Sequence, residues 1–328
     1  MKAVVCRAFG DENNLELGEM PAPKLGPGQV RIAVKAGGVN FTDTVMLAGK
    51  YQSNVKPPYV PGFEIAGQVL EVAPGVTICK PGDRVLAMLV RGGGFAEEVV
   101  AGAEMVVKIP DNMGWVEAGG FTIAWGTSYH SLTARAHLKA GENLLVLGAG
   151  GGVGLTAVAV GREIGANVIA AASSTEKLER ARAQGANSLI NYKEENLREV
   201  LKDLTKGRGV DVIYDPVGGA LFDTALRCIA QEGRIIVIGF ASGEIQQIPA
   251  NILLVKNCDV IGYTWATGDP WESNAASVRK ALESLLEWYG KGKIKSHVSV
   301  TMPMADIKKG MRLIMDRKMI GKLVLTME

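Results

Sequence analysis

The sequence predicts an α/β protein with two domains, one β-rich and the other a doubly wound parallel sheet. Its 328 residues are long for one compact domain and comfortable for two. The first third carries short apolar runs between prolines and glycines, whereas the middle alternates strand-like and helix-like segments. A composition of 47% hydrophobic and 21% charged residues supplies enough apolar material for two cores.

The N-terminal third predicts a small barrel or sandwich of short strands. Strand-like runs cover residues 30–34, 65–72 and 84–89. Turn pairs such as Pro61-Gly62 and Pro81-Gly82 separate them.

From about residue 141 the pattern predicts βα units. We expect strands at 144–147, 168–172, 188–190, 210–214 and 234–240, and helices at 155–164, 175–184, 194–204 and 220–229. Runs that are apolar on both faces are typical of parallel strands covered by helices on both sides. The alternation therefore predicts a doubly wound sheet.

After residue 261 the alternation ends. Residues 277–289 and 307–315 have amphipathic helical patterns, and 322–326 predict a closing strand. This segment is too short for a domain of its own, so we expect it to pack onto the N-terminal third. The β-rich domain is therefore placed at residues 1–125 and 263–328, and the inserted α/β domain at 126–262.

Charge and length argue against nucleic-acid and membrane partners. The 36 basic and 34 acidic residues leave a net charge of +2, without a basic footprint. Residues 143–161 are uncharged and long enough to span a bilayer, but six of them are glycines, which weaken a helix. A strand, turn and helix explain this stretch better.

Cysteine usage indicates a reducing compartment. Cys6, Cys79, Cys228 and Cys258 have no metal-ligand spacing, and the three histidines form no metal-spaced set, so no metal site is expected. The N-terminus meets charged residues too early for a secretory signal. We therefore expect a cytoplasmic protein.

A cluster of glycines follows the strand-like run 144–147. The spacing is Gly148-x-x-Gly151-x-x-Gly154, and strict GxGxxG fails because Ala149 takes the first position of the frame ending at Gly154. Such a turn between strand and helix admits a pyrophosphate, which the helix N-terminus then binds. The predicted phosphate site is Gly148, Ala149, Gly150, Gly151, Gly152, Val153 and Gly154, with Gly150 and Gly152 providing clearance. The alternative is a close helix–strand contact without a ligand.

The end of the second strand indicates which cofactor is bound. NAD sites commonly place an acid there for the ribose diol. This chain has Ser173 and Ser174 followed by Lys177, which suits a 2′-phosphate and favours NADPH. Alternatively, these residues cap and solvate a helix start.

Several longer motifs resemble the zinc-free quinone oxidoreductase (zeta-crystallin-like) branch of the medium-chain dehydrogenase/reductase superfamily. They are Val39-Asn-Phe-Thr-Asp43, Pro61-Gly-Phe-Glu-Ile-Ala-Gly67, Gly82-Asp-Arg-Val85, Gly93-Gly-Phe-Ala-Glu97, Gly148 to Gly154, Ile190-Asn-Tyr192 and Asp215-Pro-Val-Gly218. The resemblance implies a GroES-like catalytic domain built from both chain ends, an inserted Rossmann domain, an active site in the cleft and a homodimer.

Departures from the zinc alcohol dehydrogenases are equally informative. Asn40 stands near their cysteine ligand, and Gly62-Phe63-Glu64 replaces their GHE. The four-cysteine structural lobe is also missing. Because phenylalanine cannot bind zinc, the resemblance implies a site without a Lewis acid.

The resemblance also assigns individual residues. Asn40, Asp43 and Tyr51 would line the substrate cleft, with Asn40 or Tyr51 donating to a carbonyl oxygen and Tyr51 supplying a proton. Alternatively, Asn40 and Asp43 cap a helix and Tyr51 is a lid aromatic.

Six further residues are assigned to the cofactor by resemblance. Thr127 and Phe240 would lie near the nicotinamide, Tyr192 near the 2′-phosphate, Thr264 and Trp265 at the return crossing, and Lys322 near a phosphate. Core packing for Trp265 and solvation for Lys322 stay open.

These assignments predict an NADPH:quinone oxidoreductase. Without a metal, the acceptor has to be electron-poor already, as quinones are. One alternative is the reduction of enones or enoyl thioesters. A second is a non-catalytic role for an NADPH-binding protein, as a redox sensor, a structural protein or an RNA-binding protein. A third is a zinc alcohol dehydrogenase, which Phe63 opposes.

Overall fold

The computed structural model describes residues 1–52, 55–265 and 275–327. The chain divides into two compact units. We call Met1–Gly126 with Trp265–Glu328 the outer unit, and Thr127–Thr264 the inserted unit.

The outer unit is built around one long strand, β3. The seven-stranded sheet has the order β14-β15-β3-β4-β5-β7, and β6 also pairs with β3. The first residues of β3 pair with β6, and its last residues pair with β15, so two strands share one edge in succession. Its strands are β3 (Gln29–Val39), β4 (Glu64–Val72), β5 (Arg84–Met88), β6 (Glu98–Gly102), β7 (Val106–Lys108), β14 (Val298–Pro303) and β15 (Lys322–Thr326).

The C-terminal segment thus joins the N-terminal third through the pairing of β15 with β3. A separate two-stranded sheet contains β1 (Lys2–Cys6) and β2 (Leu15–Glu19). The helices of this unit are α1 (Phe41–Leu47), α2 (Trp115–Gly119), α9 (Ala275–Gly290) and α10 (Ile307–Met315). Helix α3 (Thr122–His130) runs across the boundary into the inserted unit.

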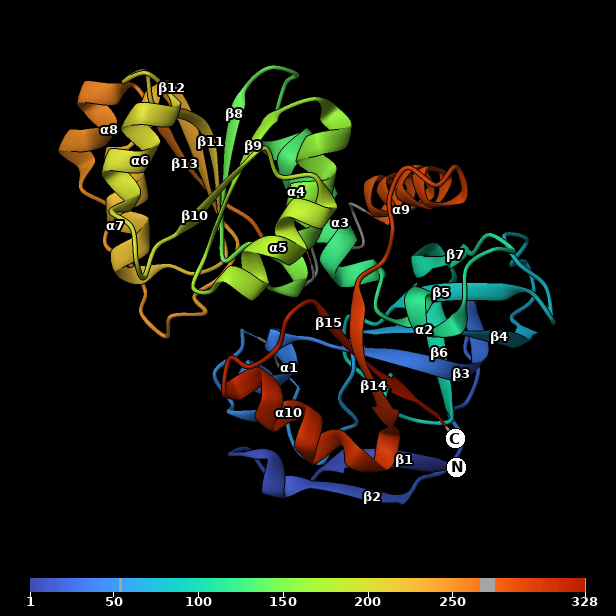
Figure 1. The fold of residues 1–328 in the computed structure, drawn as a ribbon. Coiled ribbons are helices and arrows are strands. Elements are labelled where there is room, and N and C mark those ends of the chain that lie inside the picture. Colours follow the sequence, from blue (N-terminus) through green and yellow to red (C-terminus); the bar gives the residue numbers. More distant parts are fainter. Residues whose placement is uncertain (53–54, 266–274, 328) are drawn as a thin grey trace. The chain divides into compact units, whose positions relative to one another are not determined.

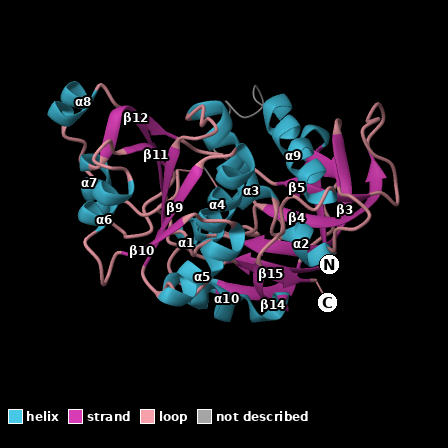
Figure 2. Cartoon of the chain, turned by 45° about the horizontal axis from the view of Figure 1, so that its top comes forward, coloured by secondary structure: helices cyan, strands magenta, loops and turns pink. Residues whose placement is uncertain are grey.

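The inserted unit is a six-stranded parallel sheet in the order β10-β9-β8-β11-β12-β13, which confirms the doubly wound fold. Helices α4 and α5 cover one face, and α6 and α7 cover the other (Figure 1). Figure 2 shows the same two layers from another angle. The elements are β8 (Asn143–Leu147), α4 (Gly152–Ile164), β9 (Asn167–Ala172), α5 (Thr175–Gln184), β10 (Ser188–Asn191), α6 (Leu197–Leu204), β11 (Val210–Asp215), α7 (Gly219–Arg227), β12 (Ile229–Val237), α8 (Ala250–Lys256) and β13 (Asp259–Gly262).

Several elements of the inserted unit differ from expectation. Helix α7 ends at Arg227 and β12 already begins at Ile229, so residue 229 is strand rather than helix. Strand β12 ends at Val237, whose pairing with Asp215 is closed by the Ile238 amide donating to the Asp215 carbonyl; beyond it the Ala241 amide donates to the carbonyl of Pro216. Phe240 therefore lies beyond the strand.

Helix α6 starts three residues later than predicted, because the Asn196 side chain accepts the amides of Arg198 and Glu199 and caps it. Helix α8 was not predicted. Its Ile252 and Leu253 pack against the core, but the adjacent Leu254 and Val255 are 79% and 72% exposed, so its apolar residues form a continuous run without helical periodicity.

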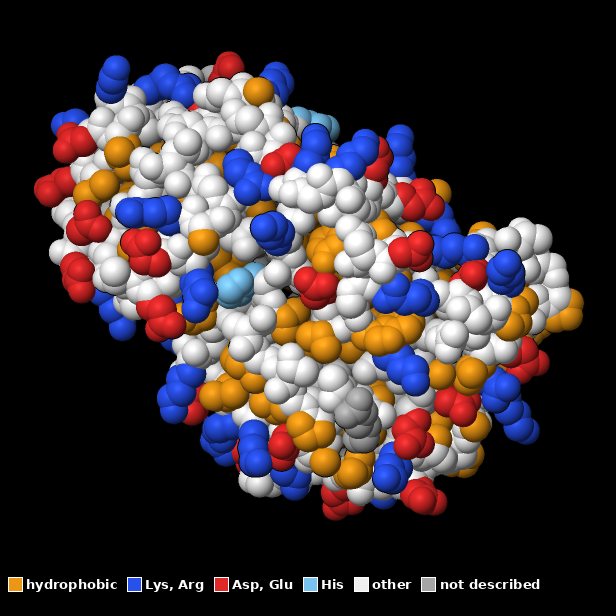
Figure 3. All heavy atoms as spheres, turned by 45° about the vertical axis from the view of Figure 1, so that its right-hand side comes forward, with side chains coloured by type: hydrophobic (Ala, Val, Ile, Leu, Met, Phe, Trp, Pro, Cys, Tyr) orange, Lys and Arg blue, Asp and Glu red, His pale blue; other side chains and the backbone are white. Residues whose placement is uncertain are grey.

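The uncharged stretch 143–161 forms β8, a turn and most of α4. Within residues 1–52, 55–265 and 275–327, no helix is both long and apolar enough to cross a bilayer. Basic and acidic side chains are interspersed on the face drawn in Figure 3.

Candidate functional site

The glycine-rich turn of the inserted unit leads from β8 into α4. Gly148 has a φ of +59°, in the left-handed region that favours glycine. Gly151 is the N-cap residue of α4, and within the described chain no side chain caps this helix end. The first-turn amides therefore lack side-chain acceptors and are suited to binding an anion.

Three glycines of the turn differ in the space around them. A Cβ on Gly154 would lie 2.3 Å from the carbonyl oxygen of Gly148, so this glycine allows α4 to pack against the turn. A Cβ on Gly150 would lie 2.5 Å from Cβ of Lys177, so Gly150 gives room to the lysine stem as well as to any phosphate. A Cβ on Gly151 would meet only the Gly148 oxygen, at 3.5 Å.

The predicted 2′-phosphate residues gather at the ends of β9 and β10. Lys177 Nζ donates to Ser173 Oγ at 3.4 Å, and Ser174 Oγ accepts the Lys177 amide at 3.5 Å, so the capping alternative also holds. Tyr192 follows β10, and its amide donates to the carbonyl of Ala172 at 3.2 Å. Burial, and then the charge of Lys193, lower the pKa of Lys177. Two ammonium groups close together would be stabilised by an anion.

Lys193 was missed by the sequence reasoning, although it directly follows Tyr192.

Three residues were assigned to the cofactor by resemblance alone. Thr127 is buried on α3, Phe240 is half-buried beside Gly218, and Thr264 ends the inserted unit.

Trp265 belongs to the outer unit and is only 4% exposed. A Cβ on Gly126 would lie 2.3 Å from its ring, which shows close packing and agrees with the core alternative.

A buried polar cluster in the outer unit surrounds Asn40 and Asp43. The Asn40 amide donates to Asp43 Oδ2 at 2.8 Å at the start of α1, and the Gly62 amide donates to Asp43 Oδ1 at 3.1 Å. The helix-capping alternative is thus observed. Burial raises the pKa of Asp43 to about 7, although Lys322 and the two amides act in the opposite direction.

Glu64 and Lys322 complete this cluster, and Lys322 has partners other than the predicted phosphate. Lys322 Nζ donates to Glu64 Oε1 and to Asn40 Oδ1. Glu64 Oε2 accepts the Ile123 amide at 2.8 Å. Glu64 and Lys322 are 0% and 7% exposed, so the alternative of a solvated Lys322 does not hold. Glu64 was not among the predicted site residues, although an acid inside the apolar run 61–67 is the signal that marks it.

Both amide hydrogens of Asn40 are engaged inside the cluster. Its Nδ2 donates to Glu64 Oε1 at 2.9 Å and to the Gly38 carbonyl at 3.3 Å. An asparagine amide has two hydrogens, so this conformation has none left for a substrate carbonyl. Tyr51 is half-buried, with its ring 6.2 Å from that of Phe63.

The residues of this cluster do not fit a catalytic zinc ion. Zinc takes thiolate, imidazole and carboxylate ligands, whereas Asn40 and Phe63 supply neither a thiolate nor an imidazole. The carboxylate of Glu64 is already paired with the Lys322 ammonium. Among the described residues, no group of three histidine, cysteine or acidic side chains could hold a metal.

Family models agree with this architecture. Residues 26–111 match the alcohol dehydrogenase GroES-like domain, and residues 152–284 match the zinc-binding dehydrogenase model. The fold and these family models define an oxidoreductase of the medium-chain dehydrogenase/reductase class.

Individual relatives narrow this class. The chain is 40% identical over 326 residues to the quinone oxidoreductase-like protein 2 homologue of Nematostella vectensis, which covers 99% of this chain and 88% of the relative. It is 33% identical over 330 residues to the 2-haloacrylate reductase of a Burkholderia species, with 98% of both covered. The structure of Escherichia coli quinone oxidoreductase complexed with NADPH matches all of both chains with a TM-score of 0.92 at 27% identity. The chain belongs to the quinone oxidoreductase-like branch of the superfamily.

Proposed function

We propose that this protein reduces quinones with NADPH. The observation that carries the cofactor choice is Lys177, which lies over the glycine-rich turn and beside Ser173, where NAD-specific sites have an acid. The E. coli relative that was solved with NADPH supports the same choice.

The residues of the inserted unit would hold the cofactor in three groups. The turn from Gly148 to Gly154 and the first-turn amides of α4 suit the pyrophosphate. Lys177, with Ser173, Ser174 and Tyr192, suits the 2′-phosphate. Thr127, Thr264 and Phe240 are assigned to the nicotinamide end. When bound, NADPH supplies the hydride.

The outer unit would supply the polar groups for the acceptor. Because the donor set does not fit zinc, negative charge on the acceptor oxygen has to be stabilised by hydrogen bonds. We assign the proton donor to Tyr51. Asn40 and Asp43 keep a place in the site, but their observed contacts make them positioning residues, held by Glu64 and Lys322.

Reduction of activated double bonds is the second candidate, favoured by the similarity to 2-haloacrylate reductase. The test compares turnover of 1,4-benzoquinone, 9,10-phenanthrenequinone, a simple enone, a 2-haloacrylate and acryloyl-CoA, each with NADPH and with NADH. We expect quinones with NADPH to be turned over fastest. If a 2-haloacrylate or the enone were turned over fastest, activated double bonds would replace quinones as the proposed acceptor. Faster turnover with NADH than with NADPH would refute the cofactor choice. Tight NADPH binding with no turnover of any acceptor would favour a sensor.

Tyr51→Phe tests the proton donor. The variant should lose turnover with an enone, whose carbon skeleton needs a proton, while its Kd for NADPH is unchanged. Unchanged turnover would remove Tyr51 from the reaction.

We also propose a homodimer through the β13 edge of the inserted sheet. Strand β13 is an edge strand, and in α8, which directly precedes it, Leu254 and Val255 are 79% and 72% exposed. Leu254→Lys should shift light-scattering mass from dimer to monomer. Leu17→Lys, at a 48% exposed position in the outer unit, is the control. A dimer that is insensitive to Leu254→Lys would exclude this interface.

A further inference from the structure

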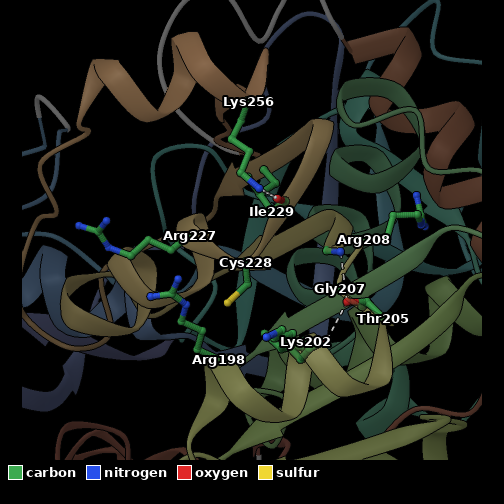
Figure 4. A pocket seen from close by; sticks show the side chains of 11 residues that line it. Arg198, Lys202, Thr205, Gly207, Arg208, Arg227, Cys228, Ile229 and Lys256 are labelled. Carbon is green, nitrogen blue, oxygen red and sulfur yellow. Dashed lines mark hydrogen bonds between the residues drawn. The ribbon is translucent and has the colours of Figure 1, made fainter.

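The inserted unit has a pocket that the proposed reaction does not use. Its volume is about 180 Å³, and it lies along α6 and at the C-terminal ends of α7 and α8 (Figure 4). Residues 205–209 and the first residue of β12 complete its wall. It is therefore at the amino ends of β11 and β12, whereas the glycine-rich turn follows the carboxyl end of β8. In a parallel sheet the amino and carboxyl ends of the strands lie on opposite sides of the domain, so this pocket is separate from the proposed NADPH site.

The pocket is lined by five cationic side chains and by no acidic one. They are Arg198, Lys202, Arg208, Arg227 and Lys256. Asp211 neutralises Arg208 through two hydrogen bonds of 2.6 Å. Lys256 Nζ donates to the carbonyl of Ile229 at 3.0 Å, which leaves its charge unpaired. In the described part of the chain, the remaining three cations form no ion pair.

Helix dipoles explain only part of this charge. Lys202, Arg227 and Lys256 lie in the last turns of α6, α7 and α8, where cations are favourable. Each helix end carries about −0.5 charge, so three ends offset roughly −1.5. Four unpaired cations against that sum leave an excess of about +2.5, which suits a multiply charged anion.

We propose that this pocket binds a small anion with two linked phosphate groups, either inorganic diphosphate or the terminal phosphates of a nucleotide. A volume of about 180 Å³ suits a group of the size of a diphosphate better than a whole dinucleotide. Arg198 and Arg227 offer planar guanidinium groups, which bind phosphate oxygens in pairs. In Figure 4 the Arg198 guanidinium lies beside Cys228, whereas the Arg227 side chain extends away from it.

Cys228 provides a built-in reporter. It is half-buried and lines the pocket, whereas Cys6, Cys79 and Cys258 are buried. Burial raises the pKa of the Cys228 thiol, so slow alkylation by iodoacetamide is expected, at a rate that depends on access. An anion seated among the cations would cover the sulfur.

The test measures the alkylation rate of Cys228 by peptide mass spectrometry, together with calorimetric titration of inorganic diphosphate, ADP and sulfate at low salt. We expect diphosphate to slow alkylation at least about fivefold, and affinity to fall as salt rises. ADP acting more strongly than diphosphate would assign the nucleotide source, and the reverse would assign the inorganic one. Equal effects of sulfate would show a pocket without phosphate selectivity and overturn the proposal.

Three variants separate this pocket from other sites. Arg198→Gln and Arg227→Gln should each weaken diphosphate binding about tenfold or more, because each removes charged hydrogen bonds. Lys206→Gln, an exposed neighbour outside the lining, should leave it unchanged. Lys177→Ala should weaken NADPH and spare diphosphate protection of Cys228. The proposal would be refuted if diphosphate no longer protected Cys228 from alkylation in Lys177→Ala. It would also be refuted if diphosphate still protected Cys228 in both arginine variants.

Discussion

Removing the Lys322 ammonium should destabilise the outer unit more than any surface substitution would. In Lys322→Met the Glu64 carboxylate, at 0% exposure, loses its counter-charge, and the Asn40 side-chain oxygen loses its donor. Breaking a buried pair from one side costs about 3–5 kcal/mol, because an uncompensated charge stays in the interior. Methionine keeps most of the lysine stem, so cavity formation adds little.

A double-mutant cycle isolates the ion pair. Glu64→Gln alone leaves a buried ammonium and should also cost about 3–5 kcal/mol. The double variant contains neither charge, and the oxygen of the new glutamine amide can still accept from the Ile123 amide. Its loss of stability should therefore fall several kcal/mol short of the sum of the two single losses.

The assay is urea unfolding followed by tryptophan fluorescence. All five tryptophans, Trp115, Trp125, Trp265, Trp271 and Trp288, lie outside the segment 127–264 in the sequence, so the signal reports the outer unit. Additive losses would show that the two charges are not coupled. A loss below about 1 kcal/mol for Lys322→Met would show a solvated pair and refute the reasoning.

Three further predictions concern the cofactor turn and the buried acid. Lys177→Ala should weaken NADPH binding about tenfold or more and leave NADH binding nearly unchanged, as measured by fluorescence titration; equal losses would contradict the 2′-phosphate role. Gly154→Ala should lower the melting temperature of the inserted unit, because its Cβ would lie 2.3 Å from the Gly148 oxygen. Gly151→Ala should weaken NADPH binding and leave the melting temperature unchanged. Similar melting temperatures for the two variants would disprove the packing argument. Because the folded pKa of Asp43 is raised to about 7 from 3.8, its contribution to stability is present at low pH and is lost as pH rises through 7, by about 3 kcal/mol between about pH 5 and pH 8. Urea unfolding of Asp43→Asn should lack that pH dependence, and a parallel pH profile would exclude Asp43 as its source.

Local patterns in the sequence predicted most of the fold. Residues 175–184 combine a serine cap, an amphipathic repeat and a terminal glycine, and α5 occupies that range. Helix α10 and strand β15 also match their predicted bounds. These signals reside within a few residues of each other, so a single sequence suffices.

The contacts that organise the outer cluster could not be predicted in this way. Glu64 and Lys322 are 258 positions apart, and nothing near either one indicates its partner. Sequence reasoning therefore placed Lys322 by motif alone. Phe240 was misplaced because the apolar run continues past Val237, where the pairing with β11 ends; the amides of residues 241 and 242 then bond to the carbonyls of residues 216 and 217.

The separation of Glu64 from Lys322 by the whole inserted unit has a consequence for synthesis on the ribosome. The inserted unit is one continuous segment, so it can fold as soon as it has emerged. The outer unit cannot finish by then, because β15 and the counter-charge of Glu64 are made only after the inserted unit. Until Lys322 emerges, Glu64 would have to be buried as a lone carboxylate, which disfavours early closure of its cluster. We expect nascent chains to carry a finished inserted unit together with an open outer one, which then depends on rapid completion or on chaperones.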